Sequence, residues 1–78
     1  MKVTRYFAAI RQRPDREIIR DEWIERAVRA PLRETIQADG RFRRWVQVAE
    51  MENRFLRVIV LSDGETVHNA FFDRRFAP

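Results

Sequence analysis

The stretch that decides the fold is Arg44–Val60, RWVQVAEMENRFLRVIV, in which apolar and polar residues alternate on both sides of a turn-forming segment. Alternation with a period of two is typical of a β-strand that buries one face. Met51–Asn53 is predicted to be a three-residue hairpin loop, because Asn53 tolerates the left-handed conformation that such loops need. Two antiparallel strands are therefore predicted, near residues 41–50 and 54–61.

The predicted loop length sets the register of this hairpin. A three-residue loop places Glu50 opposite Arg54 and Val48 opposite Leu56, so the valines and the leucine share one apolar face. A slip of one residue would expose valine and bury charge, which favours this register. The opposite face, called the open face below, carries Arg43, Trp45, Gln47, Phe55, Arg57 and Ile59.

Two further turn signals flank the hairpin. "ADG" at 38–40 is predicted to form a three-residue loop with Gly40 left-handed, and "SDGE" at 62–65 contains the last turn. These turns bound two more strands, near 32–37 and 66–73. Four successive strands joined by short turns form an antiparallel meander.

Two short helices are predicted before the sheet. Thr4 caps the first, and Pro14 ends it because proline disfavours helical conformation in the residue before it. The second begins with Asp21 as its N-cap and ends at Pro31. Its apolar residues at helical spacing are Trp23, Ile24, Ala27 and Val28. The predicted fold is α+β: two N-terminal helices packed on one face of a four-stranded antiparallel β-meander, in the order ααββββ.

Length and composition limit the class of protein. A chain of 78 residues forms a single domain, residues 1–78. The absence of cysteine excludes disulfides and thiolate metal sites and fits a reducing compartment. The first residues hold no apolar run long enough for a signal peptide or a membrane span. We therefore expect a cytoplasmic protein with no membrane partner.

The charged residues favour an anionic partner. Lysine and arginine number 16 against 12 acidic residues, and every basic residue except Lys2 is an arginine. Guanidinium groups suit phosphate because their planar fork binds two oxygens, although base composition or a thermal habitat explains an arginine excess equally well. With Gly40 and Gly64 as the only glycines, no glycine-rich phosphate loop is present.

The last hairpin decides where the only histidine, His68, lies. A two-residue turn at Asp63–Gly64 puts Val67, Asn69 and Phe71 in the core and His68 on the open face. A three-residue loop at 62–64 would instead turn His68 inward. The two-residue turn is favoured, because Val67 and Phe71 fill a core better than Thr66 and His68, the side chains that the three-residue loop would turn inward.

The open face then contains a candidate site. His68 could move a proton at neutral pH, while Arg57 and Arg74 could stabilise a pentacovalent phosphorane; Glu50 is a further candidate base. Together these catalytic candidates suit metal-independent RNA cleavage through the 2′-hydroxyl. The candidates for binding and stacking nucleic acid are Arg43, Trp45, Gln47 and Arg75.

Each of these residues also has a purely structural interpretation. A lone strand histidine is more often structural than catalytic, and arginines on a strand are commonly solvated. One histidine and scattered carboxylates have no metal-ligand spacing, so neither a metal nor a cofactor is expected.

Three motifs resemble a known family: "EWIERAVRAP" at 22–31, "DGRFRRW" at 39–45 and "RFLRVIVLSDGETVHNAFFDRRF" at 54–76. They look like an uncharacterised family of small bacterial proteins, which is similar in topology to the RelE- and BrnT-like toxins of toxin–antitoxin pairs. The resemblance implies an endoribonuclease acting on messenger RNA, silenced by a small acidic antitoxin. It implies roles on the sheet for Arg57, His68 and Arg74.

Three functional hypotheses follow. The first is a toxin-like, metal-independent endoribonuclease or RNA-binding protein. The second is a non-catalytic module that binds nucleic acid or a protein partner through the same face. The third is a homo-oligomer, in the simplest case a homodimer, with exposed Trp45, Phe55 and Phe72 as its interface.

Overall fold

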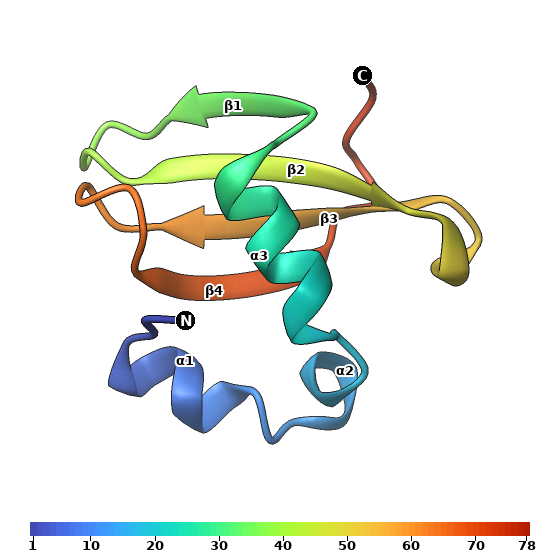
Figure 1. Cartoon of the computed structure of the whole chain (residues 1–78), viewed down its shortest axis with the longest axis horizontal. Helices are drawn as coiled ribbons and strands as arrows, with labels where there is room; N and C mark the ends of the chain where they lie inside the picture. Colours follow the sequence, from blue (N-terminus) through green and yellow to red (C-terminus); the bar gives the residue numbers. More distant parts are fainter.

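The computed structural model describes residues 1–78 and places three short helices against a four-stranded sheet (Figure 1). The helices are α1 (Arg5–Ile10), α2 (Pro14–Glu17) and α3 (Asp21–Arg29). The strands are β1 (Arg33–Ile36), β2 (Phe42–Val48), β3 (Arg54–Val60) and β4 (Val67–Phe72), with a 3₁₀ turn, η1 (Ala49–Met51), after β2. The strands follow one another across the sheet and every neighbouring pair is antiparallel, which confirms the predicted α+β meander.

The helix termini agree with the sequence in part. Thr4 caps α1, since its hydroxyl accepts the backbone N–H of Phe7 at 3.1 Å. Pro14 opens a helix of its own, α2, which the sequence analysis missed; at the first helical position a missing N–H costs no intrahelical bond. The assignment of Asp21 as N-cap was wrong by one residue, because Arg20 holds that position and Asp21 lies in the first turn.

The core lies between α3 and the near face of the sheet. α3 crosses the strands in Figure 1, and it buries Trp23, Ile24 and Ala27 almost completely. The sheet supplies the facing side chains, which are Val46, Val48, Leu56, Val58, Val60, Val67 and Ala70. The apolar faces predicted for α3, β2 and β3 are therefore confirmed.

The register of the β2–β3 hairpin differs from the prediction by two residues. Val48 lies opposite Arg54 and Val46 opposite Leu56, so the connection contains five residues and not three. It takes a 3₁₀ turn followed by two left-handed residues, Glu52 and Asn53. A shift of two residues keeps every side chain on its predicted face, which is why the core was still predicted correctly.

The last hairpin follows neither of the two predicted alternatives. Leu61 donates its N–H to the carbonyl of Thr66, which closes a four-residue loop at 62–65. Val67 then pairs with Val60, but the next pair is Asn69 with Ile59, so His68 is the extra residue of a β-bulge.

The bulge changes which side chains of β4 enter the core. Ala70 is fully buried, and Phe72 packs against the same cluster. Phe71, which was predicted to lie in the core, instead pairs with Arg57. One inserted residue is enough, because it reverses the alternation of faces for the rest of the strand.

Arg44 turns inward and ties three elements together. Its side chain is only 12% exposed and forms an ion pair with Glu34 on β1. Its guanidinium also donates to the carbonyl oxygens of Val28, at the end of α3, and of Gly64, in the last turn. A cation at a helix C-terminus satisfies carbonyls that have no intrahelical partner.

The two edges of the sheet differ. Beside β4, Val67 donates its N–H to Lys2 and accepts the N–H of Thr4, so the N-terminal residues form a short parallel bridge along this edge. No segment pairs with the outer edge of β1. None of the three helices has the length and apolar character needed to cross a membrane.

Replacing Trp23 by alanine should lower the free energy of unfolding by about 3–5 kcal/mol, because the side chain is 3% exposed and packs edge-on against Phe72. Trp23→Phe is the matched control: it keeps a ring and removes an indole N–H that is buried without a partner. Urea unfolding measures both. A loss below about 1 kcal/mol for Trp23→Ala would contradict the packing of α3.

Candidate nucleic-acid interface

A nearly buried carboxylate organises the open face of the sheet. Asp73, directly after β4, has a side chain that is 7% exposed. Its Oδ2 accepts the indole N–H of Trp45 at 3.0 Å and two N–H groups of Arg57, at 3.0 and 2.9 Å. Burial raises the pKa of Asp73, but the hydrogen bonds from Trp45 and Arg57 outweigh it, and the pKa lies below its ordinary value.

The C-terminal residues cover part of this face. Phe76 stacks on Trp45 with ring centroids 4.7 Å apart and also lies against Phe55. Arg33 on β1 sits over the ring of Phe76 and reaches the carbonyl of Ala77. In Figure 1 the chain leaves β4, passes behind β3 and β2, and ends beside β2, on the side away from α3. Trp45 is therefore only 5% exposed, and its predicted exposure as an oligomer contact is wrong.

The structure brings some of the predicted site residues together. Arg57 lies beside Trp45 and also over the ring of Phe71, and its charge is matched by Asp73. Arg75 is exposed next to the same carboxylate, and its backbone N–H donates to it.

The other predicted residues on β2 have separate surroundings. Gln47 is exposed and donates to the carbonyl of Asn53, while Arg43 is partly buried and leaves its Nε without a partner. Glu50 is exposed in η1. None of the three contacts the Asp73 carboxylate.

His68 lies apart from Arg57, the arginine that was predicted to act with it. Its Nδ1 is 3.0 Å from the hydroxyl of Thr4, and its ring stacks on Tyr6 at 5.0 Å, so its partners belong to the α1 segment. Arg57 pairs with Phe71, three residues further along β4, or about 10 Å at the usual rise of a strand. Desolvation first, and the charge of Arg41 second, lower the pKa of His68 below its ordinary value.

A different group of side chains forms a groove at the end of the β3–β4 pair. One hollow of about 340 Å³ is lined by Arg54, Phe55, Phe72, Asp73, Arg74 and Phe76. A second, of about 310 Å³, is lined by Asp15, Arg16, Ile18, Arg54, Phe71, Phe72 and Arg74. The two hollows adjoin, since Arg54, Phe72 and Arg74 line both, and together they are called here the arginine–phenylalanine groove.

Strand register explains why two arginines meet in this groove. Leu56 pairs with Phe72, and the N–H of Asp73 donates to the carbonyl of Phe55, so the pairing runs on past the end of β4. Two residues beyond Leu56 and Phe72 in this register are Arg54 and Arg74. Neither guanidinium forms an ion pair, and in this they resemble most of the fifteen arginines, of which six are paired.

The acidic residues of the groove do not offset these charges. The carboxylate of Asp73 is already bonded to Trp45 and Arg57, and Asp15 pairs with Arg16. Arg54 stacks over the ring of Phe72, with its central carbon 4.7 Å from the ring centroid. The groove therefore combines two guanidinium groups that form no ion pair with several aromatic rings.

The sequence analysis selected Arg74 but missed Arg54 and the phenylalanines of this groove. The available signal was the pair of charged and aromatic runs at the two strand ends, RF at 54–55 and FFDRRF at 71–76. To recognise that these two runs meet, the β3–β4 register had to be known. The bulge at His68 made that register unpredictable from the sequence.

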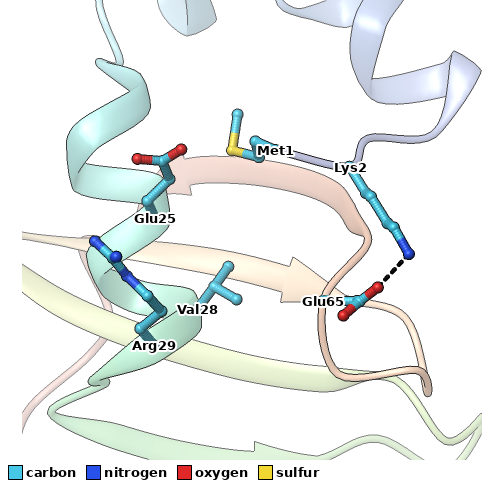
Figure 2. A pocket seen from close by; sticks show the side chains of 6 residues that line it. All are labelled: Met1, Lys2, Glu25, Val28, Arg29 and Glu65. Carbon is cyan, nitrogen blue, oxygen red and sulfur yellow. Dashed lines mark hydrogen bonds and ion pairs between the residues drawn. The ribbon is translucent and has the colours of Figure 1, made fainter.

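A third hollow, of about 320 Å³, lies on the other side of α3 and has balanced charge. Figure 2 shows the Lys2 ammonium directed at Glu65, with Glu25 projecting from α3 toward Met1 and Arg29 on the same helix directed away from Lys2. The charged side chains that line it are two cations and two carboxylates, which balance one another. No group of three or more histidine, aspartate or glutamate side chains is arranged to hold a metal ion.

Comparison of the chain with protein-family models, with curated proteins and with solved structures finds no match. Function is therefore inferred from the geometry of the groove.

Replacing Asp73 by alanine should lower the free energy of unfolding by about 2–4 kcal/mol, because it leaves Arg57 and the indole of Trp45 without their shared acceptor. The stabilisation is present above about pH 4 and is lost as the pH falls further, since the folded-state pKa is lowered. Asp15→Ala, which breaks an exposed arginine pair, is the control and should cost no more than about 1 kcal/mol. Equal losses in the two variants, measured by urea unfolding, would contradict the role given to Asp73.

The lowered pKa of His68 predicts a second pH dependence. The folded state disfavours the imidazolium, so the stabilisation is complete above about pH 6.5 and is lost as the pH falls through the folded-state pKa. Unfolding of the wild type and of His68→Gln should be compared at about pH 7.5 and 5.5. The wild type should lose more stability on acidification than the variant; identical pH profiles would contradict the environment described for the ring.

Proposed function

We propose that the protein binds single-stranded RNA through the arginine–phenylalanine groove, without cleaving it. The observation that carries this proposal is the pairing of two unneutralised guanidinium groups, Arg54 and Arg74, in one aromatic-lined groove. A planar guanidinium fork suits phosphate, as it suits carboxylate, because it engages two oxygens at once.

The two guanidinium charges favour a groove that holds an anion over a groove that is empty. Like charges that face each other across paired strands repel, so Arg54 and Arg74 destabilise the end of the hairpin when nothing lies between them. A bound phosphate removes that repulsion. The stacking of Arg54 on Phe72 restricts its guanidinium plane before binding and so lowers the entropy lost when a phosphate is engaged.

The aromatic side chains favour a single strand over a duplex. Three partly buried phenylalanines border the two hollows. Phe76 already stacks on Trp45 and Phe71 lies under arginine side chains, so Phe55 is the ring proposed to stack on a base. An unstacked base of a single strand can stack on such a ring, whereas a base inside a duplex is already stacked between its neighbours. RNA is proposed over DNA because the resemblance to toxin-like proteins implies messenger RNA as the target.

Binding is favoured over cleavage by the surroundings of the three catalytic candidates. Arg57 is neutralised by Asp73, and the partners of His68 belong to the α1 segment. Of the three, only Arg74 has a free guanidinium in the groove. A toxin-like endoribonuclease stays as a finer hypothesis, which the cleavage test below addresses. A small acidic antitoxin-like partner that covers the groove is a further hypothesis.

The test is binding of a fluorescently labelled single-stranded RNA, followed by anisotropy at low and moderate salt. Arg54→Ala and Arg74→Ala should each weaken binding by about 3–10-fold at low salt and reduce the salt slope, because each removes a phosphate contact. Single-stranded DNA and duplex RNA of the same sequence should bind more weakly.

Arg29→Ala is the matched control, because it removes the same charge from an exposed arginine that forms no ion pair and lies in the third hollow. Its affinity should stay within about twofold of the wild type. The proposal fails if Arg29→Ala weakens binding as much as the two groove variants do. RNA fragments that accumulate in the presence of EDTA and disappear in Arg74→Ala would replace the binding proposal with the ribonuclease hypothesis.

A further inference from the structure

The second hollow of the groove carries more positive charge than the first, because α2 adds an arginine to it. Arg16 lines this hollow together with Arg54 and Arg74, and it does not line the first. In Figure 1 α2 lies near the end of β4, and the Arg16 guanidinium lies over the ring of Phe71 on that strand, with its central carbon 5.6 Å from the ring centroid. The second hollow is therefore lined by three guanidinium groups and a single carboxylate, that of Asp15.

Arg16 is held in place by the fold but uses little of its hydrogen-bonding capacity. Its side chain is 18% exposed, and the one hydrogen bond of its guanidinium goes from a single Nη to Oδ2 of Asp15. Its Nε is buried without an acceptor, which is not the case for Arg54 or Arg74. A buried donor without a partner costs free energy, and native structures mostly avoid it. A ligand oxygen would give this guanidinium the second acceptor that the chain does not supply.

The Asp15 carboxylate is a partner that a phosphate can replace. Asp15 is next to Arg16 in the sequence and its side chain is 66% exposed, so the pair contributes little net stability. A phosphodiester group carries one negative charge, as the carboxylate does, and it is also attracted by Arg54 and Arg74. Exchange of the carboxylate for a phosphate therefore keeps Arg16 neutralised and gives the ligand one more contact.

The linings of the two hollows set the order in which a strand meets these residues. Phe55, the ring proposed to stack on a base, borders only the first hollow, and Arg16 borders only the second. Arg54 and Arg74 border both. Phosphates and nucleosides alternate along RNA, so a base on Phe55 and a phosphate at the arginine pair direct the next phosphate toward Arg16. Ile18, which is 49% exposed in the second hollow, offers apolar surface to the nucleoside between the two phosphates.

We propose that Arg16 binds a second, consecutive phosphate, so that the ligand of the groove is a single strand with at least two adjacent phosphodiester groups. This inference rests on the proposed function and deepens it. It gives α2, the helical turn that the sequence analysis missed, a role in binding. A strand with one phosphate occupies only the part of the site that Arg54 and Arg74 form.

Two short RNAs separate the second phosphate from the first, because the dinucleotide UpU has one phosphodiester group and the trinucleotide UpUpU has two. NMR titration of the labelled protein at low salt should give UpUpU an affinity about fivefold higher than that of UpU. Arg16→Ala should weaken UpUpU binding by about 3–10-fold and leave UpU within about twofold, because it removes only the second phosphate contact. Arg54→Ala should weaken both ligands, since both place a phosphate at that residue.

Asp15→Asn tests the same site by a gain of affinity. It removes the carboxylate that competes with the second phosphate, so UpUpU should bind about 2–5-fold more tightly, with UpU unchanged within about 1.5-fold. Glu17→Gln is the matched control, because it removes the same charge from an exposed residue of α2 that forms no ion pair and does not line the groove. Its affinity for UpUpU should stay within about 1.5-fold of the wild type.

The results separate this inference from the proposed function. Circular dichroism establishes that each variant is folded, and the Asp15→Asn comparison decides if Arg16→Ala is not. The second phosphate site is overturned, with the groove kept as the binding site, if Arg54→Ala weakens both RNAs while Arg16→Ala weakens neither or weakens both equally. The same holds if Asp15→Asn gains no more affinity than Glu17→Gln. A wild type that binds neither RNA overturns both proposals.

Discussion

The hydrogen bonds of Asp73 determine how the chain ends and which surface it exposes. One carboxylate oxygen accepts three N–H groups from Trp45 and Arg57, and the other accepts the backbone N–H of Arg75. Because this carboxylate follows directly after β4, it turns the chain across the open face and places Phe76 on Trp45. The indole, an obvious base-stacking platform in the sequence, becomes part of a packed layer instead.

The same carboxylate separates the arginines of this region into two roles. Arg57 forms an ion pair with Asp73 and lies over the rings of Trp45 and Phe71, so it stabilises the fold. Arg74, one residue further along the chain, keeps a free charge and meets Arg54 at the strand ends. Residue type alone does not distinguish these roles. They differ in whether a carboxylate reaches the guanidinium, and that depends on the register of strands far apart in the sequence.

Much of the fold could be predicted because side chains alternate between the two faces of a strand. A register error of an even number of residues therefore leaves each side chain on its predicted face. The β2–β3 loop was assigned too short by two, yet Val46, Val48 and Leu56 stayed on the correct face. The loop itself was not predictable from its composition, since Glu52 adopts a left-handed conformation that glutamate seldom takes. The bulge at His68 shifts β4 by an odd number and therefore reversed the faces of the residues after it.

The candidate site was harder to predict than the core, because it depends on that bulge and on tertiary partners. His68 is accompanied by Thr4 and Tyr6, more than sixty residues away in the chain, and no local pattern indicates this. Arg54 was predicted only as the strand residue opposite Glu50. Its pairing with Arg74 follows only from the observed β3–β4 register.

The central claim is that RNA engages the groove at the strand ends and leaves the covered open face undisturbed. An NMR titration of the ¹⁵N-labelled protein with a short single-stranded RNA tests this most directly. The account predicts that the backbone amides of Arg54, Phe72 and Arg74 shift progressively, while the indole N–H of Trp45, held by Asp73, keeps its position. The opposite result would contradict the account. If the signals of that indole and of the Arg43 and Gln47 amides shift strongly while those of the groove residues do not, RNA binds the open face instead.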